Sequence, residues 1–267
     1  MNVLCILTAW NEMEYLPFKV EYCRQNKLDL YVIDHMSNDG SWEWLQENNI
    51  SSHRFDNGGI FDLPSLQSEI SRTVHRLKPD WVIYNGCDLF PITLDPLAEH
   101  LEKLERQGFS AGEIDFINIF NTGEQRSDDP FSTYFYYAAS ALTTKRSDTP
   151  VSFKKLTMIH KYNPLSVYVG DSVSFPGIKI GKIEGVMVNY GGTKSVAQGE
   201  ATFQRRIKAW LAGTTGIGAG AHYQQSSNKN WEWSKAELDD VRTTKYWPYI
   251  QKVQKVSAQI SKVALLI

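Results

Sequence analysis

Three short segments of the chain carry acids or amides directly after an apolar run. The first contains Asn11 and Glu12, the second contains Asp34 and Asp39, and the third contains Asp88. Carboxylate and amide oxygens accept hydrogen bonds from the N–H and O–H groups of bases and sugars. The residue types therefore suit the binding of a polar ligand such as a nucleotide or a nucleotide sugar.

Each of these segments follows a stretch with the pattern of a buried strand. Residues 3–7, 30–33 and 81–84 are continuous apolar runs, too short for helices and rich in β-branched or aromatic side chains. Helical patterns separate the runs, so the strands are expected to be parallel. Parallel strands bring their carboxyl ends to one edge of a sheet, where open α/β sheets bind ligands. We therefore predict a nucleotide crevice at this edge.

The second segment, LYVIDHMSNDGS, is the most informative stretch. Residues 37–40 supply turn chemistry, and Ser41 is predicted to be the N-cap of a helix that follows. Asp34 is either a ligand contact or a turn cap, and the two neighbouring strand ends favour the ligand. Asp39 is a ligand contact or a residue that shapes the turn.

The remaining elements follow from periodicity and from Pro and Gly positions. Leu16 is expected to begin a helix with Pro17 in its first turn, and Pro79 is expected to stop another helix. Further predicted elements are a helix that begins at Asp95-Pro96 with Leu97, Leu101 and Leu104 inward, strands over 113–120 and 131–137, short strands over 138–185, and helices over 197–211 and 245–267.

Composition excludes several classes of protein. A formal net charge of −2 over 267 residues argues against nucleic-acid binding, which needs a basic excess. Three cysteines without metal-like spacing indicate free thiols in a reducing compartment, so we expect a cytoplasmic protein. The first residues form an expected strand and not a signal peptide, and no apolar run is long enough to span a membrane.

The C-terminal tail carries four lysines and no acid from Lys245 onward. Ile250, Val253 and Ile260 fall near one face of the expected helix. Docking on the domain or on a partner is favoured for this face. Peripheral contact with a membrane surface, which would place the protein at the inner face of the membrane, is the alternative.

The segments TAWNEMEYLP, VIDHMSNDGS and DWVIYNGCDLF together resemble the N-terminal half of family 2 glycosyltransferases with a GT-A fold. The resemblance is strongest to bacterial members with Leu-Pro shortly after Asn-Glu, and it covers residues 3–90. A weaker similarity runs through VNYGGTKSVAQGEATFQRRIKAW. Neither a GxGxxG fingerprint nor a Walker loop is present.

The resemblance implies an α/β fold of GT-A type: a Rossmann-related, mostly parallel sheet flanked by helices, with a mixed C-terminal half and a terminal helix. Residues 1–110 would then form the nucleotide-sugar-binding half of one domain. Residues 111–212 would form its acceptor-side half, and residues 213–267 a flexible Gly-rich loop with a helical appendage.

The resemblance also implies a reaction, which is transfer of a sugar from a UDP, dTDP or GDP donor to an acceptor hydroxyl. The acceptor would be a glycan or a lipid-linked molecule in surface polysaccharide or glycolipid assembly. Asn11, Glu12, Asp34 and Asp39 would hold the base and ribose. Asp88 matches the last acid of the family's Asp-x-Asp motif, which holds Mg²⁺ or Mn²⁺ against the diphosphate.

The chain departs from the family pattern at four positions. Gly86 replaces the first acid of the metal motif, and Leu89 replaces the acid that often follows it. Asn189 stands where a His is common, so a second metal ligand is missing there. His35 occupies a position where relatives often have an acid or amide, which leaves the preferred nucleobase open.

Inverting transfer requires a general base for the acceptor hydroxyl. Asp171 is favoured because it follows an apolar run and precedes a Pro-Gly turn, although it could equally cap that turn. The other candidates for this role are Glu124, Asp128, Asp129 and His160. Weaker candidates for phosphate contact are Lys194, Arg205 and Arg206, and those for base or sugar stacking are Trp10, Trp231 and Trp233.

Two alternative functions are compatible with the same residues. A nucleotide-sugar or glycan-binding protein that has lost catalysis would explain Gly86, Leu89 and Asn189. A nucleotidyltransferase would use a similar sheet, but it is expected to show a Gly-rich loop and a Lys after the first strand. The TAWNE segment has neither.

Overall fold

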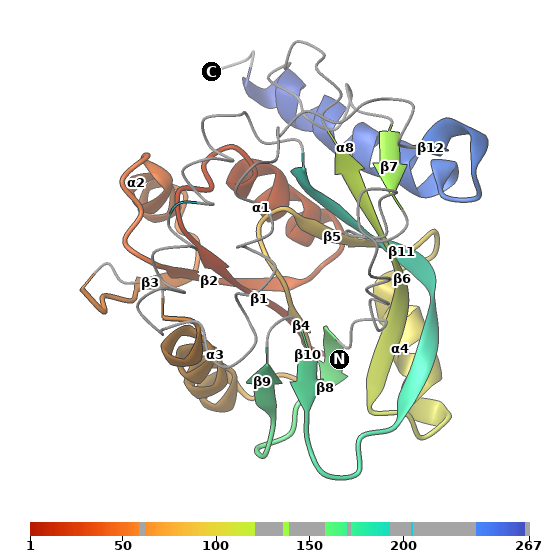
Figure 1. Ribbon diagram of the computed structural model, residues 1–267, viewed down its shortest axis with the longest axis horizontal. Helices are drawn as coiled ribbons and strands as arrows, with labels where there is room; N and C mark the ends of the chain where they lie inside the picture. The colour runs from red at the N-terminus through yellow and green to blue at the C-terminus, as the bar shows by residue number, and fades with distance from the viewer. Residues whose placement is uncertain are drawn as a thin grey trace.

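A computed structural model describes residues 1–58, 62–120, 136–138, 158–169, 172–192, 204 and 239–264. A ten-stranded sheet forms the centre, with the strand order β12-β7-β6-β8-β4-β1-β2-β3, and β11 pairs with both β5 and β6. Helices flank the sheet, which curls across the molecule (Figure 1). The predicted α/β class with a parallel first half and a mixed second half is confirmed.

The first half of the sheet consists of four parallel strands. They are β1 (Val3–Ala9), β2 (Asp29–Asp34), β3 (Ser52–Arg54) and β4 (Trp81–Tyr84). β1 lies between β2 and β4 and pairs with both in parallel. The three predicted strands are therefore neighbours, and their carboxyl ends share one edge.

The helices of this half begin and end close to their predicted positions. Pro17 lies in the first turn of α1 (Leu16–Gln25), where its missing N–H costs no hydrogen bond. Asp62 caps α3 (Leu63–Leu77) by accepting a hydrogen bond from the Ser65 N–H. α4 (Leu97–Arg106) buries Leu97, Leu101 and Leu104, as its spacing predicts.

The predicted N-cap of the second helix is wrong by one residue. α2 (Ser41–Glu47) has Gly40 as its N-cap, with φ of 91°, and Ser41 is its first helical residue. The Ser41 hydroxyl instead donates to Asp39 Oδ1 at 2.6 Å and accepts a hydrogen bond from the Glu12 N–H at 3.2 Å. A left-handed turn that glycine adopts freely sets the helix start, and this frees Ser41 to bind neighbouring loops.

The second half of the sheet is mixed. β11 pairs in parallel with β6 and antiparallel with β5, so it joins the end of the first half to the second half. β8 lies antiparallel between β4 and β6. The elements are β5 (Leu89–Ile92), β6 (Ala111–Phe120), β7 (Tyr136–Ala138), β8 (Ile159–Lys161), β9 (Val167–Val169), β10 (Ser172–Ser174), β11 (Ile180–Gly192), β12 (Asp239–Asp240) and η2 (Val241–Thr243).

Side chains alternate between two apolar layers, as strand geometry requires. On one face, Cys5 and Leu7 of β1 pack with residues of α1, α4 and α8. On the other face, Leu4 and Ile6 pack with α3 and with the hairpin of β9 and β10. Burial on both faces explains why the first strands are continuous apolar runs.

The C-terminal helix α8 (Trp247–Ala264) begins on the domain itself. Ile250 and Val253 are buried in the same core layer as α1. Lys252 donates a hydrogen bond to the Thr93 carbonyl at 2.7 Å, and partial burial lowers the pKa of its ammonium. The favoured docking of this face is confirmed for the first turns of the helix. Within the described ranges no helix is both long and apolar enough to cross a bilayer.

Candidate functional site

Asp34 ends β2 at the carboxyl edge of the parallel sheet. Its Cα pairs with Ala9 of β1, and the His35 N–H donates to the Ala9 carbonyl at 2.7 Å. The side chain of Asp34 is completely buried. The position that the sequence predicts for a ligand contact is therefore the end of a central strand, next to the loop after β1.

The two oxygens of the Asp34 carboxylate have different surroundings. Oδ2 accepts hydrogen bonds from Arg54 Nε at 3.0 Å and from the Ser37 N–H at 3.2 Å. Oδ1 is buried and has no hydrogen-bond donor among the described residues. An unsatisfied buried acceptor is destabilising by about 1–3 kcal/mol. One oxygen thus holds the loop, while the other is a buried acceptor without a donor among the described residues.

Arg54 provides the counter-charge for Asp34 from the end of β3. Its Nη2 also donates to the Ser37 carbonyl at 2.6 Å, and its guanidinium lies 5.2 Å from the centre of the Trp42 ring. These contacts fix the turn after β2 against two neighbouring elements. Sequence reasoning missed Arg54, because the three residues of β3 are too short and polar to be recognised as a strand.

The loop after β1 is bound to the loop after β2. Asn11 has a φ of 55°, which Asn tolerates better than most residues. Its N–H donates to Ser37 Oγ at 2.9 Å, and its side-chain amide exchanges two hydrogen bonds of 2.9 Å with Asn38. The first two predicted segments therefore form one connected structure at the sheet edge.

Asp39 lies at the centre of this connection. Its Oδ2 accepts a hydrogen bond from the Met13 N–H at 3.1 Å, and its Oδ1 accepts from the N–H and the hydroxyl of Ser41. The Glu12 N–H donates to Ser41 Oγ, as described above. Asp39 therefore shapes the turn, which is one of the two roles that the sequence left open, and its contact with a ligand stays a prediction.

His35 follows Asp34 and is also buried. Its Nε2 lies 2.8 Å from Asn57 Oδ1, and its ring stacks on Phe55 with centroids 6.1 Å apart. These neighbours come from the segment after β3. The ring is thus fixed against the segment after β3.

The third predicted segment forms the turn between β4 and β5. Asp88 is half-buried. Its main-chain carbonyl accepts a hydrogen bond from the Tyr190 N–H at 2.9 Å. Asn189 pairs with Leu89 across the sheet and donates its amide to Asn118 Oδ1 at 2.7 Å. The segment with the weaker family similarity therefore reaches the turn that carries Asp88.

Asp88 is the acid that the sequence predicts for a divalent cation, and this role stays a prediction. A Cβ added at Gly86 would lie 2.7 Å from Asp88 Oδ1, so the carboxylate turns back over the glycine. No group of three or more His, Cys, Asp or Glu side chains able to hold a metal exists in the described part of the chain. Mg²⁺ typically needs only one or two carboxylates when phosphate and water complete its coordination.

His160 is a structural residue of the core. It is fully buried in β8, with Nδ1 donating to the Lys161 carbonyl at 2.8 Å and Nε2 lying 3.2 Å from the Tyr168 hydroxyl. Burial lowers the pKa of its imidazole to about 4. Both ring nitrogens are occupied within the core, as expected for a satisfied structural histidine.

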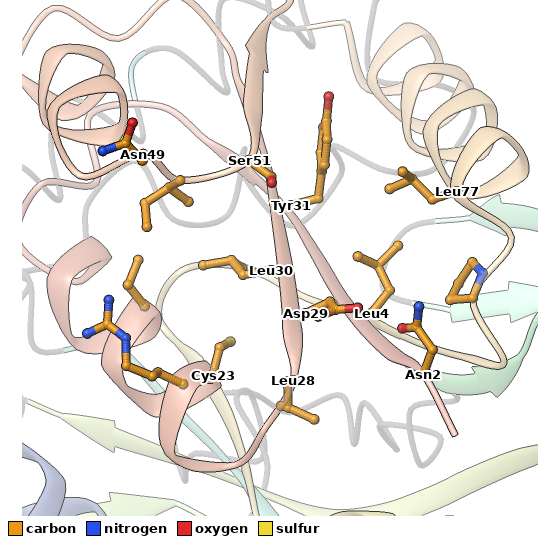
Figure 2. A pocket seen from close by; sticks show the side chains of 14 residues that line it. Asn2, Leu4, Cys23, Leu28, Asp29, Leu30, Tyr31, Asn49, Ser51 and Leu77 are labelled. Atoms are coloured by element: carbon orange, nitrogen blue, oxygen red, sulfur yellow. The ribbon is translucent and has the colours of Figure 1, made fainter.

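A cavity of about 430 Å³ lies among residues at the amino ends of the parallel strands, with Leu4, Asp29 and Tyr31 in its lining (Figure 2). Its lining includes Asn2, Asp29, Ser51 and Pro79, which begin or precede the four parallel strands. Open α/β sheets bind ligands outside the carboxyl ends of their strands. This cavity is therefore distinct from the predicted crevice.

Several predicted residues lie outside the part of the chain that the structure describes. They are the favoured base Asp171, the alternatives Glu124, Asp128 and Asp129, the cations Lys194, Arg205 and Arg206, and the indoles Trp231 and Trp233. The predicted helix over 197–211 lies outside it too, apart from Gln204. Their roles stay predictions.

Comparison with known proteins gives structural neighbours only. No protein family model and no curated protein matches the chain. Staphylococcus aureus TarS is 10% identical over 84% of this chain, with a TM-score of 0.42, and this chain covers 42% of that chain. TarS 1–349 in complex with UDP-GlcNAc is 11% identical over 84% of this chain and 70% of its own, with a TM-score of 0.43.

A third neighbour is glucosyl-3-phosphoglycerate synthase from Mycobacterium tuberculosis in complex with Mn²⁺, UDP-glucose and phosphoglyceric acid. It is 16% identical over 43% of this chain and 44% of its own, with a TM-score of 0.34. No family assignment follows from these values, and the predicted Asn-Glu/Leu-Pro subgroup stays a prediction.

Proposed function

We propose that the protein is a glycosyltransferase that uses a nucleoside diphosphate sugar as donor. The observation that carries the proposal is the Asp34 Oδ1 atom, a buried acceptor without a donor among the described residues, at the carboxyl edge of a parallel sheet. Buried polar atoms in native proteins nearly always have a partner. A base N–H or a ribose hydroxyl of the donor nucleotide is the partner we assign to it.

The residues around Asp34 would position this nucleotide. Arg54 fixes the carboxylate through the hydrogen bond from its Nε, and the stacked rings of His35 and Phe55 follow β2 and β3 at the same end of the sheet. Asn11 and Glu12 lie in the loop that is bound to the turn after β2. In this arrangement Asp34 accepts from the ligand, and the Asn11–Glu12 loop lies at the same edge of the sheet.

Asp88 would hold Mg²⁺ or Mn²⁺ against the diphosphate. The ion would supply positive charge that stabilises the leaving nucleoside diphosphate. In the chain itself, the Tyr190 N–H holds the backbone at Asp88, and Gly86 leaves room for the carboxylate. The single carboxylate implies an ion that binds together with the donor.

Asp171 is proposed as the general base of an inverting transfer. It would take the proton of the acceptor hydroxyl on the side of the sugar away from the diphosphate. The acceptor is proposed to be a glycan or a lipid-linked molecule in surface polysaccharide or glycolipid assembly. An Asp171→Asn variant that keeps both acceptor transfer and donor hydrolysis would remove Asp171 from this role.

The test of the proposal is titration of UDP into the protein with and without Mn²⁺. We expect UDP to bind, and Mn²⁺ to tighten binding in the wild type but not in Asp88→Ala. A screen of nucleotide-sugar donors by thermal shift then identifies the sugar, because a ligand that binds only the native state raises its stability. Absence of any nucleotide binding would overturn the proposal.

A second candidate function is a nucleotide-sugar-binding protein without catalysis. Gly86 and Leu89 favour it, because they leave Asp88 as the sole carboxylate in the turn. Donor turnover separates the two functions. UDP binding without hydrolysis or transfer of any bound donor would support the binding protein.

A further inference from the structure

Lys19 is a fully buried lysine in α1. Its ammonium donates hydrogen bonds to Asn85 Oδ1 at 3.0 Å and to the Leu89 carbonyl. It forms no ion pair with any carboxylate of the described residues. Taking an ammonium out of water costs several kcal/mol, so a buried lysine with only neutral acceptors needs an explanation beyond stability.

The two acceptors of Lys19 lie on either side of Asp88 in the turn between β4 and β5. Asn85 is the first residue after β4, and Leu89 is the first residue of β5. The Asn85 amide also donates to the Leu89 carbonyl at 3.3 Å, and the Leu89 N–H donates to the Gly86 carbonyl at 3.3 Å. Lys19 therefore connects the two ends of the turn, because its ammonium donates to Asn85 at one end and to Leu89 at the other.

The surroundings of the ammonium hold it at this point. It lies 4.9 Å from the centre of the Phe90 ring and 5.7 Å from that of Tyr22, both within cation–π range. The Cys5 thiol lies 3.7 Å from the same Asn85 oxygen. Because this oxygen accepts from Lys19, the Asn85 amide nitrogen is turned toward Leu89.

We propose that Lys19 is a positioning residue for the divalent cation, acting by fixing the turn that presents Asp88. This inference rests on the proposed function. An apolar side chain of similar length would fill the same space without the cost of burying a charge. Such a side chain would leave Asn85 and Leu89 without their shared donor, and the turn would no longer have one defined conformation.

The test is the Lys19→Met variant, with Mn²⁺ affinity measured by electron paramagnetic resonance in the presence of saturating UDP. We expect affinity to fall by about 10-fold, the lower end of the effect of residues that orient metal ligands. Thermal unfolding should occur near the wild-type temperature, because removal of a buried charge offsets the loss of the hydrogen bonds to Asn85 and Leu89. A general loss of stability would lower the unfolding temperature, so it cannot explain weaker Mn²⁺ binding at a wild-type unfolding temperature.

Tyr22→Phe is the matched control. Tyr22 lies one turn further along α1, is buried in the same layer, and donates its hydroxyl to the Pro91 carbonyl beyond the turn. This variant should unfold at a lower temperature and bind Mn²⁺ like the wild type. Asn85→Ala removes the side-chain oxygen that accepts from Lys19. We expect this variant to weaken Mn²⁺ binding as Lys19→Met does.

Wild-type Mn²⁺ affinity in folded Lys19→Met or in folded Asn85→Ala would overturn the inference. A wild-type protein that binds UDP but no Mn²⁺ would also overturn it, and would leave the nucleotide part of the proposed function intact. A wild-type protein that binds no Mn²⁺ and none of UDP, dTDP and GDP would overturn the proposed function itself. The two proposals therefore fail in distinguishable ways.

Discussion

The turn after β2 and the turn after β4 lie at the same edge of the sheet but are held in opposite ways. At the turn after β2, the acids themselves hold the structure: Asp34 binds Arg54, and Asp39 binds both Met13 and Ser41. At the turn after β4, Asp88 is held through its backbone. The side chain that fixes this second turn is Lys19, which lies beneath it.

This difference separates two kinds of functional residue. After β2, the groups proposed to meet the nucleotide also join two loops, so stability and nucleotide binding are coupled. After β4, the proposed ligand of the cation and the residue that fixes it are different side chains. Substitutions at the first turn should therefore change both properties, and those at the second turn should change cation binding alone.

Lowering the pH is expected to give the largest change in stability. The group responsible is His160 in β8, the strand that pairs with β4. The pKa of His160 in β8 is lowered to about 4 by burial, against about 6.5 in an unfolded chain. Folding therefore favours the neutral imidazole, and above pH 6.5 the folded protein keeps its full stability because His160 is neutral in both states. As pH falls from 6.5 to 4, the free energy of unfolding should fall by about 3 kcal/mol.

Urea unfolding at a series of pH values measures this slope. His160→Gln should show a much flatter dependence between pH 6.5 and 4, because the group that titrates has been removed. Equal slopes in the wild type and in this variant would contradict the role assigned to His160.

Arg54→Met is expected to show the coupling at the turn after β2. It leaves the buried Asp34 carboxylate without its counter-charge, which should lower the free energy of unfolding by about 2 kcal/mol. The value is below that of a fully buried pair because the Arg54 side chain is 35% exposed. UDP affinity should fall as well, which calorimetry measures.

Arg76→Met is the control for this variant. Arg76 also lies over an aromatic ring, that of Tyr31 at 5.4 Å, and donates to the Tyr31 hydroxyl, but it has no carboxylate partner among the described residues. Its loss should change stability by less than about 0.5 kcal/mol. If Arg54→Met lowered stability and left UDP binding unchanged, the two properties would not be coupled at this turn.

Gly86→Ala is expected to have a smaller effect, restricted to the cation. The new Cβ would lie 2.7 Å from Asp88 Oδ1 and would push the carboxylate aside. Because the flexible end of a side chain can move away, stability should change little. Mn²⁺ affinity should fall by about 10-fold, and UDP binding without Mn²⁺ should stay the same. A fall in metal-free UDP binding would show that the two turns are not independent.

The sequence predicts the parallel half of the fold because the information there is local. Apolar runs identify β1, β2 and β4, and Pro17 and Pro79 mark helix boundaries. Parallel pairing then places Asn11 and Asp34 at one edge without any knowledge of side-chain contacts. The candidate nucleotide site could therefore be predicted as a set of residues, although not as a set of hydrogen bonds.

The remaining features depend on contacts that are distant in the sequence. β5 contains Pro91 and forms because β11, nearly one hundred residues later, pairs with it. Lys19 looks like an exposed helix residue in a local pattern, and its acceptors Asn85 and Leu89 lie 66 and 70 residues away. No periodic or compositional signal reports such contacts. Arg54 was missed for a second reason, because the short and polar β3 gives no strand pattern.

The most direct test of the account is calorimetric titration of UDP into the wild type and into Asp34→Asn. The asparagine keeps the shape of the side chain, but it has only one acceptor oxygen to serve both Arg54 and the ligand. We predict that the wild type binds UDP and that the variant binds at least about 10-fold more weakly, as expected for the loss of a charged hydrogen bond. Equal affinities of the two proteins for UDP, or a wild type that binds none of UDP, dTDP and GDP, would contradict the assignment of Asp34 to the nucleotide.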